Sequence, residues 1–207
     1  SGPNNTAVGY QSLRYVTTGY NNNAFGYHAL LNTTTGYNNS AFGRSTLEQN
    51  TTGGNNTSVG HYSLNLNNTG GNNTAVGYEA LKFNTTDNNT AVGYQAGYSV
   101  TTGSSNVFIG YQAGLDTTTA FGTVGVGYNA LANQTTGTNN TAIGYNSLTT
   151  LSTGTRNTAV GWNSGYNVST GGNNVSFGYE SLFNQTTAFT NTAIGYQALY
   201  STVSGGR

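Results

Sequence analysis

The side chains in this sequence that could carry acid–base or metal chemistry are few. They are two histidines and five acidic residues: His28, His61, Glu48, Glu79, Asp87, Asp116 and Glu180. Hydrolysis by paired carboxylates needs them within about 10 Å of each other, and nucleophilic hydrolysis needs a serine or cysteine beside a histidine. The chain has no cysteine, no Asp-rich calcium repeat and no phosphate-binding loop. Whether any of these seven side chains meet depends on the elements that carry them.

Those elements follow from glycines that recur along the whole chain. Every interval between successive members is 17 residues, except for one interval of 16 between Gly77 and Gly93. The series is Gly9, Gly26, Gly43, Gly60, Gly77, Gly93, Gly110, Gly127, Gly144, Gly161, Gly178 and Gly195. Twelve such units fill the chain, which predicts a single repeat domain over residues 1–207 with twelve coils and no separate cap domain.

The repeated unit favours a β-solenoid. Its consensus, N-N-T-A-[VFI]-G-Y-x-[AS]-L-x-x-x-T-T-G-x, is rich in Gly, Asn and β-branched residues, which disfavour helices. A helical repeat also needs longer units, of roughly 30 residues or more. We therefore predict an all-β fold, a parallel β-solenoid (β-roll) of about twelve 17-residue coils. Coils stacked about 4.8 Å apart would form a rod on the order of 55–60 Å long.

Two columns of apolar residues are candidates for the core of this rod. The residue before each glycine is always Val, Phe or Ile, and we expect this column to point into the coil. The fourth residue after the glycine is Leu in nine units and is expected to form a second internal ladder. On this assignment, Val92→Asp should unfold the coils around it by burying an unpaired charge. The predicted structural core ladder is Val8, Phe25, Phe42, Val59, Val76, Val92, Ile109, Val126, Ile143, Val160, Phe177 and Ile194.

Two further columns should hold the coils together. An asparagine precedes the expected strand in eleven of twelve units, with Thr123 as the exception. Its amide can bond to the equivalent amide of the next coil, which predicts an asparagine ladder. The invariant glycine is expected where the chain turns or where two backbones approach closely.

The solenoid keeps the acid–base residues apart. Glu79 and Glu180 share a column but lie six coils apart, roughly 29 Å at strand spacing. His28 and His61 occupy different columns two coils apart, and neither has a carboxylate that repeats in phase with it. We therefore predict that the chain is not an enzyme, with no catalytic residue, no metal ion and no cofactor.

The charge and the apolar content of the sequence limit the classes of binding partner that we expect. Only 5% of residues are charged and the formal net charge is zero, which argues against nucleic acid, because phosphate binding needs clustered Lys and Arg. No run of about 18 apolar residues is present, so no membrane insertion of this segment is expected. A thin rod with an exposed apolar column and columns of small residues should associate with itself.

Some units carry a more specific phrase. The segments "SNVFIG" (105–110), "NNTAIG" (139–144) and "NNVSFG" (173–178) resemble the N-S-V-A-I-G repeat of YadA-like head domains. These heads belong to trimeric autotransporter adhesins of bacteria, and related repeats occur in bacteriophage tail fibres. The resemblance implies a left-handed parallel β-roll, three copies packed side by side, and attachment to surfaces, so the predicted self-association is a homotrimer. It further implies an extracellular, cell-surface or virion location, with a cell-surface glycan or host receptor as partner.

An aromatic column follows the invariant glycine. It is Tyr in nine units, with Arg44, His61 and Trp162 in the other three. We favour a structural stack, since a binding site would not need nine copies; a platform for sugar rings is the functional alternative. The three departures, Arg44, His61 and Trp162, form a candidate binding patch.

Two other functions compete with a structural or adhesive fibre segment. Thr18, Thr35, Thr52 and Thr69 would lie in line on the rod, and regular threonines on a flat solenoid face suit an ice-binding protein. Threonine is also a good strand residue, so the pattern has a purely structural explanation. A subunit of a head-to-tail extracellular filament is the third alternative, because neither end of the sequence reads as a polar cap.

Overall fold

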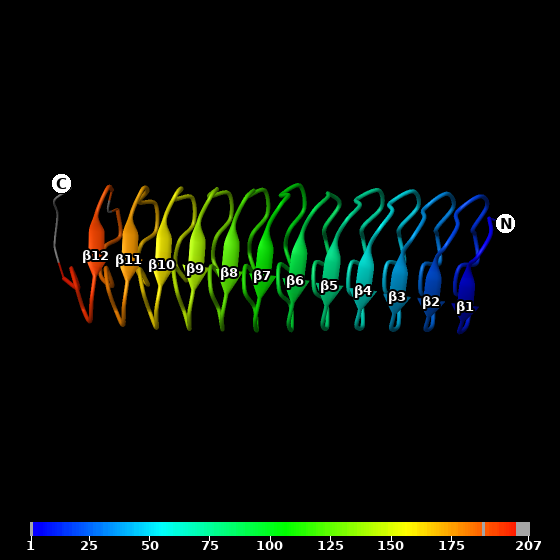
Figure 1. The fold of residues 1–207 in the computed structure, drawn as a ribbon, viewed down its shortest axis with the longest axis horizontal. Helices are drawn as coiled ribbons and strands as arrows, with labels where there is room; N and C mark the ends of the chain where they lie inside the picture. Colours follow the sequence, from blue (N-terminus) through cyan, green and yellow to red (C-terminus); the bar gives the residue numbers. More distant parts are fainter. Residues whose placement is uncertain (1, 188, 202–207) are drawn as a thin grey trace.

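The structure, a computed structural model, describes residues 2–187 and 189–201 and confirms the predicted all-β parallel β-solenoid. No helix lies in those ranges, so none there is long and apolar enough to cross a membrane. Each coil contributes one three-residue strand, and the strands stack in chain order into a twelve-stranded parallel sheet along one side of the rod (Figure 1). The strands are β1 (Thr6–Val8), β2 (Asn23–Phe25), β3 (Ser40–Phe42), β4 (Thr57–Val59), β5 (Thr74–Val76), β6 (Thr90–Val92), β7 (Val107–Ile109), β8 (Val124–Val126), β9 (Thr141–Ile143), β10 (Thr158–Val160), β11 (Val175–Phe177) and β12 (Thr192–Ile194).

Each coil, numbered here by its strand, stacks on the next in one register. Val8 of β1 lies opposite Phe25 of β2, 17 residues further along the chain. The step from β5 to β6 is one residue shorter, yet Thr74 still lies opposite Thr90, its equivalent in the consensus. The missing residue therefore falls in the turn near Asp87, where a change of length disturbs no strand.

The strand turns its middle residue inward and not the Val, Phe or Ile that follows it. Ala24 is fully buried, whereas Val8 is 54% exposed and Ile194 is 69% exposed. A T-A-V strand can face either way, and the leucines across the narrow interior leave room only for a small side chain. The prediction of an inward Val, Phe and Ile ladder was therefore wrong. Its members are half-buried or exposed on the outer face of the sheet: Val8, Phe25, Phe42, Val59, Val76, Val92, Ile109, Val126, Ile143, Val160, Phe177 and Ile194.

The leucine column is an internal ladder, as predicted. Leu30, Leu47 and Leu64 have no exposed surface and belong to one cluster with the buried alanines Ala24 and Ala29. The leucines of this column have a left-handed φ between 46° and 57°. That conformation costs a non-glycine residue roughly 1–2 kcal/mol, and full burial of a leucine offsets it with about 1.5–3 kcal/mol.

Three coils have glycine in the leucine column without a change in chain path. Gly97 and Gly114 have φ values of 60° and 63°, close to those of the leucines. Phe108, the middle residue of β7, is fully buried and fills the interior space between them. The middle residue of the next strand is Gly125, which leaves room for the phenyl ring.

The predicted asparagine ladder is confirmed. Asn39 Nδ2 donates to Asn22 Oδ1 at 3.0 Å and to the Gly53 carbonyl at 2.9 Å. Asn39 Oδ1 accepts from the backbone N–H of Asn56 at 3.0 Å, so each amide joins successive coils. Thr123 interrupts the ladder as the sequence indicated. Because these side chains are buried, the bonds satisfy polar atoms that water does not reach.

The invariant glycines have two reasons to lack a side chain. Their φ values lie between +122° and +143°, a region that other residues rarely adopt. A Cβ added to Gly43 would also lie 2.6 Å from the carbonyl oxygen of Gly60 in the next coil. The glycine column therefore allows both the turn after the strand and the close stacking of backbones.

Candidate functional surfaces

The acidic and histidine side chains do not converge on one site. No group of three or more His, Cys, Asp or Glu is placed to share a metal ion in the part of the chain that the structure describes. His28 Nδ1 lies 3.5 Å from Glu48 Oε1, and Lys82 Nζ lies 2.7 Å from Glu79 Oε1. These are two separate pairs, the first half-buried and the second with Glu79 buried.

The Glu79–Lys82 pair is held in its charged form. Burial raises the pKa of Glu79, but hydrogen bonds from Lys82 and Gln95 and the charge of Lys82 outweigh it and leave the pKa below its usual value. The hydrogen bond to Glu79 raises the pKa of Lys82, against an opposing effect of burial. A general acid or base working near neutral pH needs shifts in the opposite directions. The pair therefore suits a structural role, linking Lys82 and, through Gln95, the next coil.

The aromatic column is a continuous stack over most of the rod. Tyr111 and Tyr128 have ring centroids 5.0 Å apart and planes inclined by 7°. Each ring within the stack has neighbours on both faces, so its edge faces solvent while its faces are covered. A platform for sugar rings needs an open face, and the rings inside the stack, from Tyr94 to Tyr179, do not offer one. The stack comprises Tyr78, Tyr94, Tyr111, Tyr128, Tyr145, Trp162, Tyr179 and Tyr196.

The predicted patch of Arg44, His61 and Trp162 is not one site. Arg44 and His61 lie in adjacent coils, where Arg44 Cζ is 5.6 Å from the Tyr27 ring centroid and His61 stacks on Tyr62 at 5.0 Å. They fill the gap in the aromatic column by cation–π and ring contacts. Trp162 belongs to the stack six coils further along, roughly 29 Å from His61 at strand spacing.

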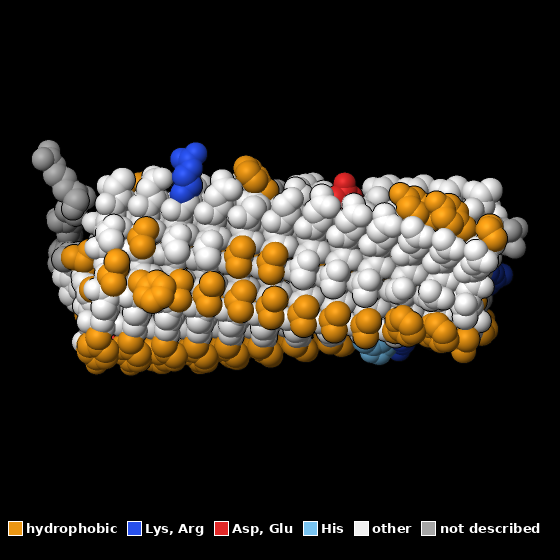
Figure 2. Space-filling view, in the orientation of Figure 1, with side chains coloured by type: hydrophobic (Ala, Val, Ile, Leu, Met, Phe, Trp, Pro, Cys, Tyr) orange, Lys and Arg blue, Asp and Glu red, His pale blue; other side chains and the backbone are white. Residues whose placement is uncertain are grey.

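The outward Val, Phe and Ile column and the aromatic column together form an exposed surface, which we call the apolar stripe. The two columns flank the invariant glycines, and in Figure 2 hydrophobic side chains run along the whole length of the rod. Phe25 and Phe42 stack within it at 4.9 Å. Tyr128 is 42% exposed and Phe177 is 54% exposed, so the stripe is open to solvent in the single chain.

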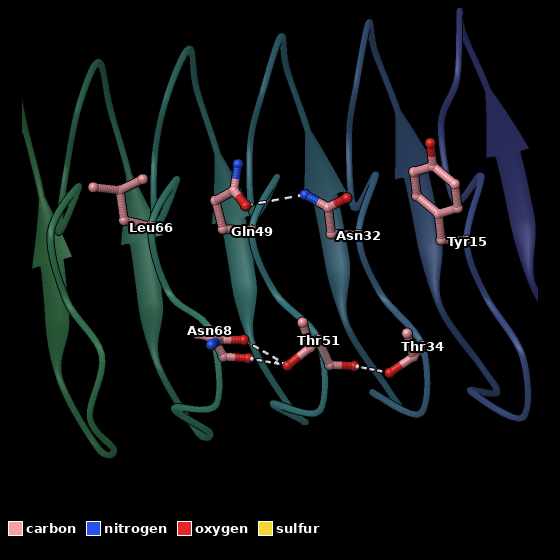
Figure 3. A pocket seen from close by; sticks show the side chains of 7 residues that line it. All are labelled: Tyr15, Asn32, Thr34, Gln49, Thr51, Leu66 and Asn68. Atoms are coloured by element: carbon pink, nitrogen blue, oxygen red, sulfur yellow. Dashed lines mark hydrogen bonds between the residues drawn. The ribbon is translucent and has the colours of Figure 1, made fainter.

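A shallow groove of about 680 Å³ lies on a different face of coils 1 to 4 (Figure 3). Its lining residues lie six or eight positions after the invariant glycines, outside the strands and outside both columns of the apolar stripe. We call it the polar groove; its lining residues are Tyr15, Asn32, Thr34, Gln49, Thr51, Leu66 and Asn68.

Sequence reasoning missed the polar groove. Its lining residues come from the sixth and eighth positions after the invariant glycine. The consensus specifies no residue at the sixth position and threonine at the eighth. A signal was present, because the sixth position changes from Tyr15 through Asn32 and Gln49 to Leu66 over the first four units. A column that varies while its neighbours repeat is the place to expect a local site.

The chain has no match among protein-family models, curated proteins or solved structures. The functional proposals below therefore rest on the apolar stripe, the polar groove and the distribution of charge.

Proposed function

We propose that this chain is a structural and adhesive fibre segment, a stiff β-solenoid rod that spaces or presents a surface-attachment function outside the cell or on a virion. The observation that carries the proposal is the apolar stripe on a rod with 5% charged residues and no net charge. Such a surface repeats in every coil, which suits contacts made along a fibre. Catalysis needs one constellation, and the dispersed pairs Glu48–His28 and Glu79–Lys82 support a non-enzymatic role.

The apolar stripe also supports a homotrimer. Contiguous apolar surface of this extent normally marks an interaction site. A second copy of the chain would present the same residues at the same 17-residue repeat, so its stripe would match coil for coil. The resemblance to YadA-like heads favours three copies side by side, with the stripes at the shared interface.

Mass in solution tests this assembly. We expect three times the chain mass of 21.5 kDa for the wild type, and a lower mass for the double variant Val59→Asp, Val76→Asp. Thr35→Asp, on an exposed column away from the stripe, is the matched control and should remain trimeric. A monomeric wild type would contradict the trimer, and a series of larger masses would support the head-to-tail filament instead. Binding of the trimer to whole cells tests attachment.

Ice binding is a second candidate with an observation in its favour. The ninth position after the invariant glycine, where the consensus has the second threonine of T-T-G, holds an exposed threonine in ten coils: Thr18, Thr35, Thr52, Thr69, Thr102, Thr119, Thr136, Thr153, Thr170 and Thr187. The first threonine has a structural use, since Thr34 Oγ1 donates to the carbonyl of Thr51 in the next coil at 3.2 Å. Thermal hysteresis that is lost in a Thr102→Lys, Thr119→Lys variant would favour ice binding over the fibre role.

A further inference from the structure

We propose that the polar groove on coils 1 to 4 binds a short neutral saccharide. The proposal rests on the attachment function above and gives it a ligand class. Since no residue of the strands or of the apolar stripe lines the groove, a trimer formed through the stripe leaves it open to solvent.

Tyr15 supplies an aromatic platform at one end of the groove. Its side chain is 49% exposed, and in Figure 3 its ring is seen face-on beside Asn32. The Arg14 guanidinium lies 5.3 Å from the ring centroid, and no other ring in the described ranges stacks on Tyr15. Leu66 is 37% exposed at the other end, so the groove has an apolar contact at each end for the C–H faces of a sugar.

Between these ends the groove offers paired donors and acceptors. Asn32 Nδ2 donates to Gln49 Oε1 at 3.0 Å, and this bond orients both amides. Thr51 Oγ1 likewise bonds Asn68 Oδ1 at 2.5 Å. Asn32 Oδ1, Gln49 Nε2 and Asn68 Nδ2 then have no partner among the described residues, and Figure 3 places the first two along the rim. One acceptor and two amino groups in fixed positions suit the hydroxyls of a sugar.

The lining also sets the charge and length of the ligand. None of its seven residues is charged, and the nearby Arg14 guanidinium lies over the Tyr15 ring and outside the lining, so the lining favours a neutral sugar. Four coils span about 14 Å at strand spacing, which suits a short oligosaccharide.

Among the described residues, the column of Tyr15 runs aromatic, amide, amide, apolar in coils 1 to 4 alone, although an amide pair recurs at Asn167 and Asn184. At the position of Tyr15, coil 5 has Phe83, whose ring packs edge-on against Tyr98 at 5.0 Å, and coil 7 has the charged Asp116. A surface that is built only in coils 1 to 4, in a chain that otherwise repeats, is what a specific site requires.

Binding to oligosaccharides tests the proposal. We would screen the full chain on immobilised neutral and acidic oligosaccharides, and then titrate cellotriose and maltotriose in solution while following amide NMR shifts. We expect neutral glycans to be retained, with shifts confined to coils 1 to 4. Tyr15→Ala should weaken binding at least about tenfold, and Tyr20→Ala, an exposed tyrosine of the same coil outside the groove, should not.

A second pair of variants tests the amides without removing an aromatic side chain. Gln49→Glu replaces the free donors by a charge and should also weaken binding at least about tenfold, whereas Asn133→Asp, in the same column outside the groove, should have no effect. Retention of acidic glycans only, of peptides only, or of no neutral glycan would overturn the proposal, as would equal binding by Tyr15→Ala and wild type. A monomeric chain that binds a neutral trisaccharide would refute the trimer and leave the groove standing. A trimer whose Tyr15→Ala and Gln49→Glu variants still attach to cells and bind glycans as the wild type does would refute the saccharide site and leave the proposed fibre function standing.

Discussion

Phe108 of coil 7 fills the interior beside Gly114, where most coils carry a leucine. The large side chain has moved from the leucine column to the strand, and the leucine position has lost its side chain in exchange. Leu30 with Ala24 is the usual form of the same packing. In coil 7 the interior therefore conserves volume across the two columns and not within each one.

This exchange predicts a compensating pair of substitutions. Phe108→Ala should lower the free energy of unfolding by about 3–5 kcal/mol, because it leaves a cavity that the short coils cannot close. Gly114→Leu alone should also destabilise, since its side chain would meet the phenyl ring. The double variant recreates the usual Ala and Leu packing and should be more stable than either single variant, as measured by denaturant unfolding. Phe121→Ala, an exposed phenylalanine outside the apolar stripe, is the control and should cost less than about 1 kcal/mol.

Adjacent residues of β6 should respond oppositely to a charge. Ala91 is fully buried, so Ala91→Asp should cost more than about 3 kcal/mol by placing an unpaired carboxylate in the interior. Val92 points outward, so Val92→Asp should leave the coil folded and weaken self-association. Thermal unfolding by circular dichroism and mass in solution separate the two effects. Thr90→Asp, on the same outer face as Val92, controls for an added surface charge, and unfolding by Val92→Asp would restore the Val column to the core.

The invariant glycine column allows backbone strain and steric clash to be separated. Gly43→Ala combines a φ of +139° with a Cβ that would lie 2.6 Å from the Gly60 carbonyl oxygen, so we expect a loss above about 3 kcal/mol. Gly195→Ala has a similar φ of +122° but no atom within 4 Å of the added Cβ, and should cost about 1–3 kcal/mol. Denaturant unfolding measures the loss in free energy of unfolding for each variant. Equal losses would mean that close approach of the coils contributes nothing.

The Glu79–Lys82 pair predicts a modest pH dependence. The pKa of Glu79 is lowered in the folded chain, so its stabilisation is present above the ordinary value of 4.5 and is lost as the pH falls through the folded pKa. The pKa of Lys82 is raised, so its share is lost only as the pH rises above 10.5. Glu79→Gln should cost about 1 kcal/mol or less at pH 7, and this cost should shrink as the pH is lowered below 4.5, by urea unfolding.

Glu180→Gln is the matched control for that measurement. Glu180 occupies the same column and accepts a hydrogen bond of 2.9 Å from Gln197, as Glu79 does from Gln95 at 2.9 Å. No lysine pairs with it among the described residues. A pH dependence as large for Glu180→Gln as for Glu79→Gln would show that the lysine is not its source.

Much of the fold follows from the sequence because a parallel stack converts a repeat into columns. Residues 17 apart become neighbours, so the ladder through Asn22 and Asn39 and the burial of Leu30 could be predicted from the period alone. The period also places Glu79 and Glu180 six coils apart, which argues against paired-carboxylate catalysis. Even the short unit near Asp87 is accommodated in a turn because the strands on either side keep their register.

The period could not decide which face of each strand lies inside. A three-residue strand such as Thr90–Val92 offers Ala91 to one side and Val92 to the other, and both are apolar. The choice depends on the volume that the leucines already occupy across the interior, which is a property of the assembled coil. Only the tertiary structure therefore placed the Val, Phe and Ile column in solvent beside the tyrosines.

The candidate functional surfaces were likewise predicted in part from the sequence and decided in part by the tertiary structure. The sequence by itself determined the repeat, the parallel stacking and the columns, because these depend only on spacing along the chain. The tertiary structure decided that the rings of Tyr111 and Tyr128 cover each other's faces and that Tyr15 and Asn68, from coils 1 and 4, line one groove. Those relationships depend on the direction of each side chain from a closed coil, and spacing carries no information about that direction.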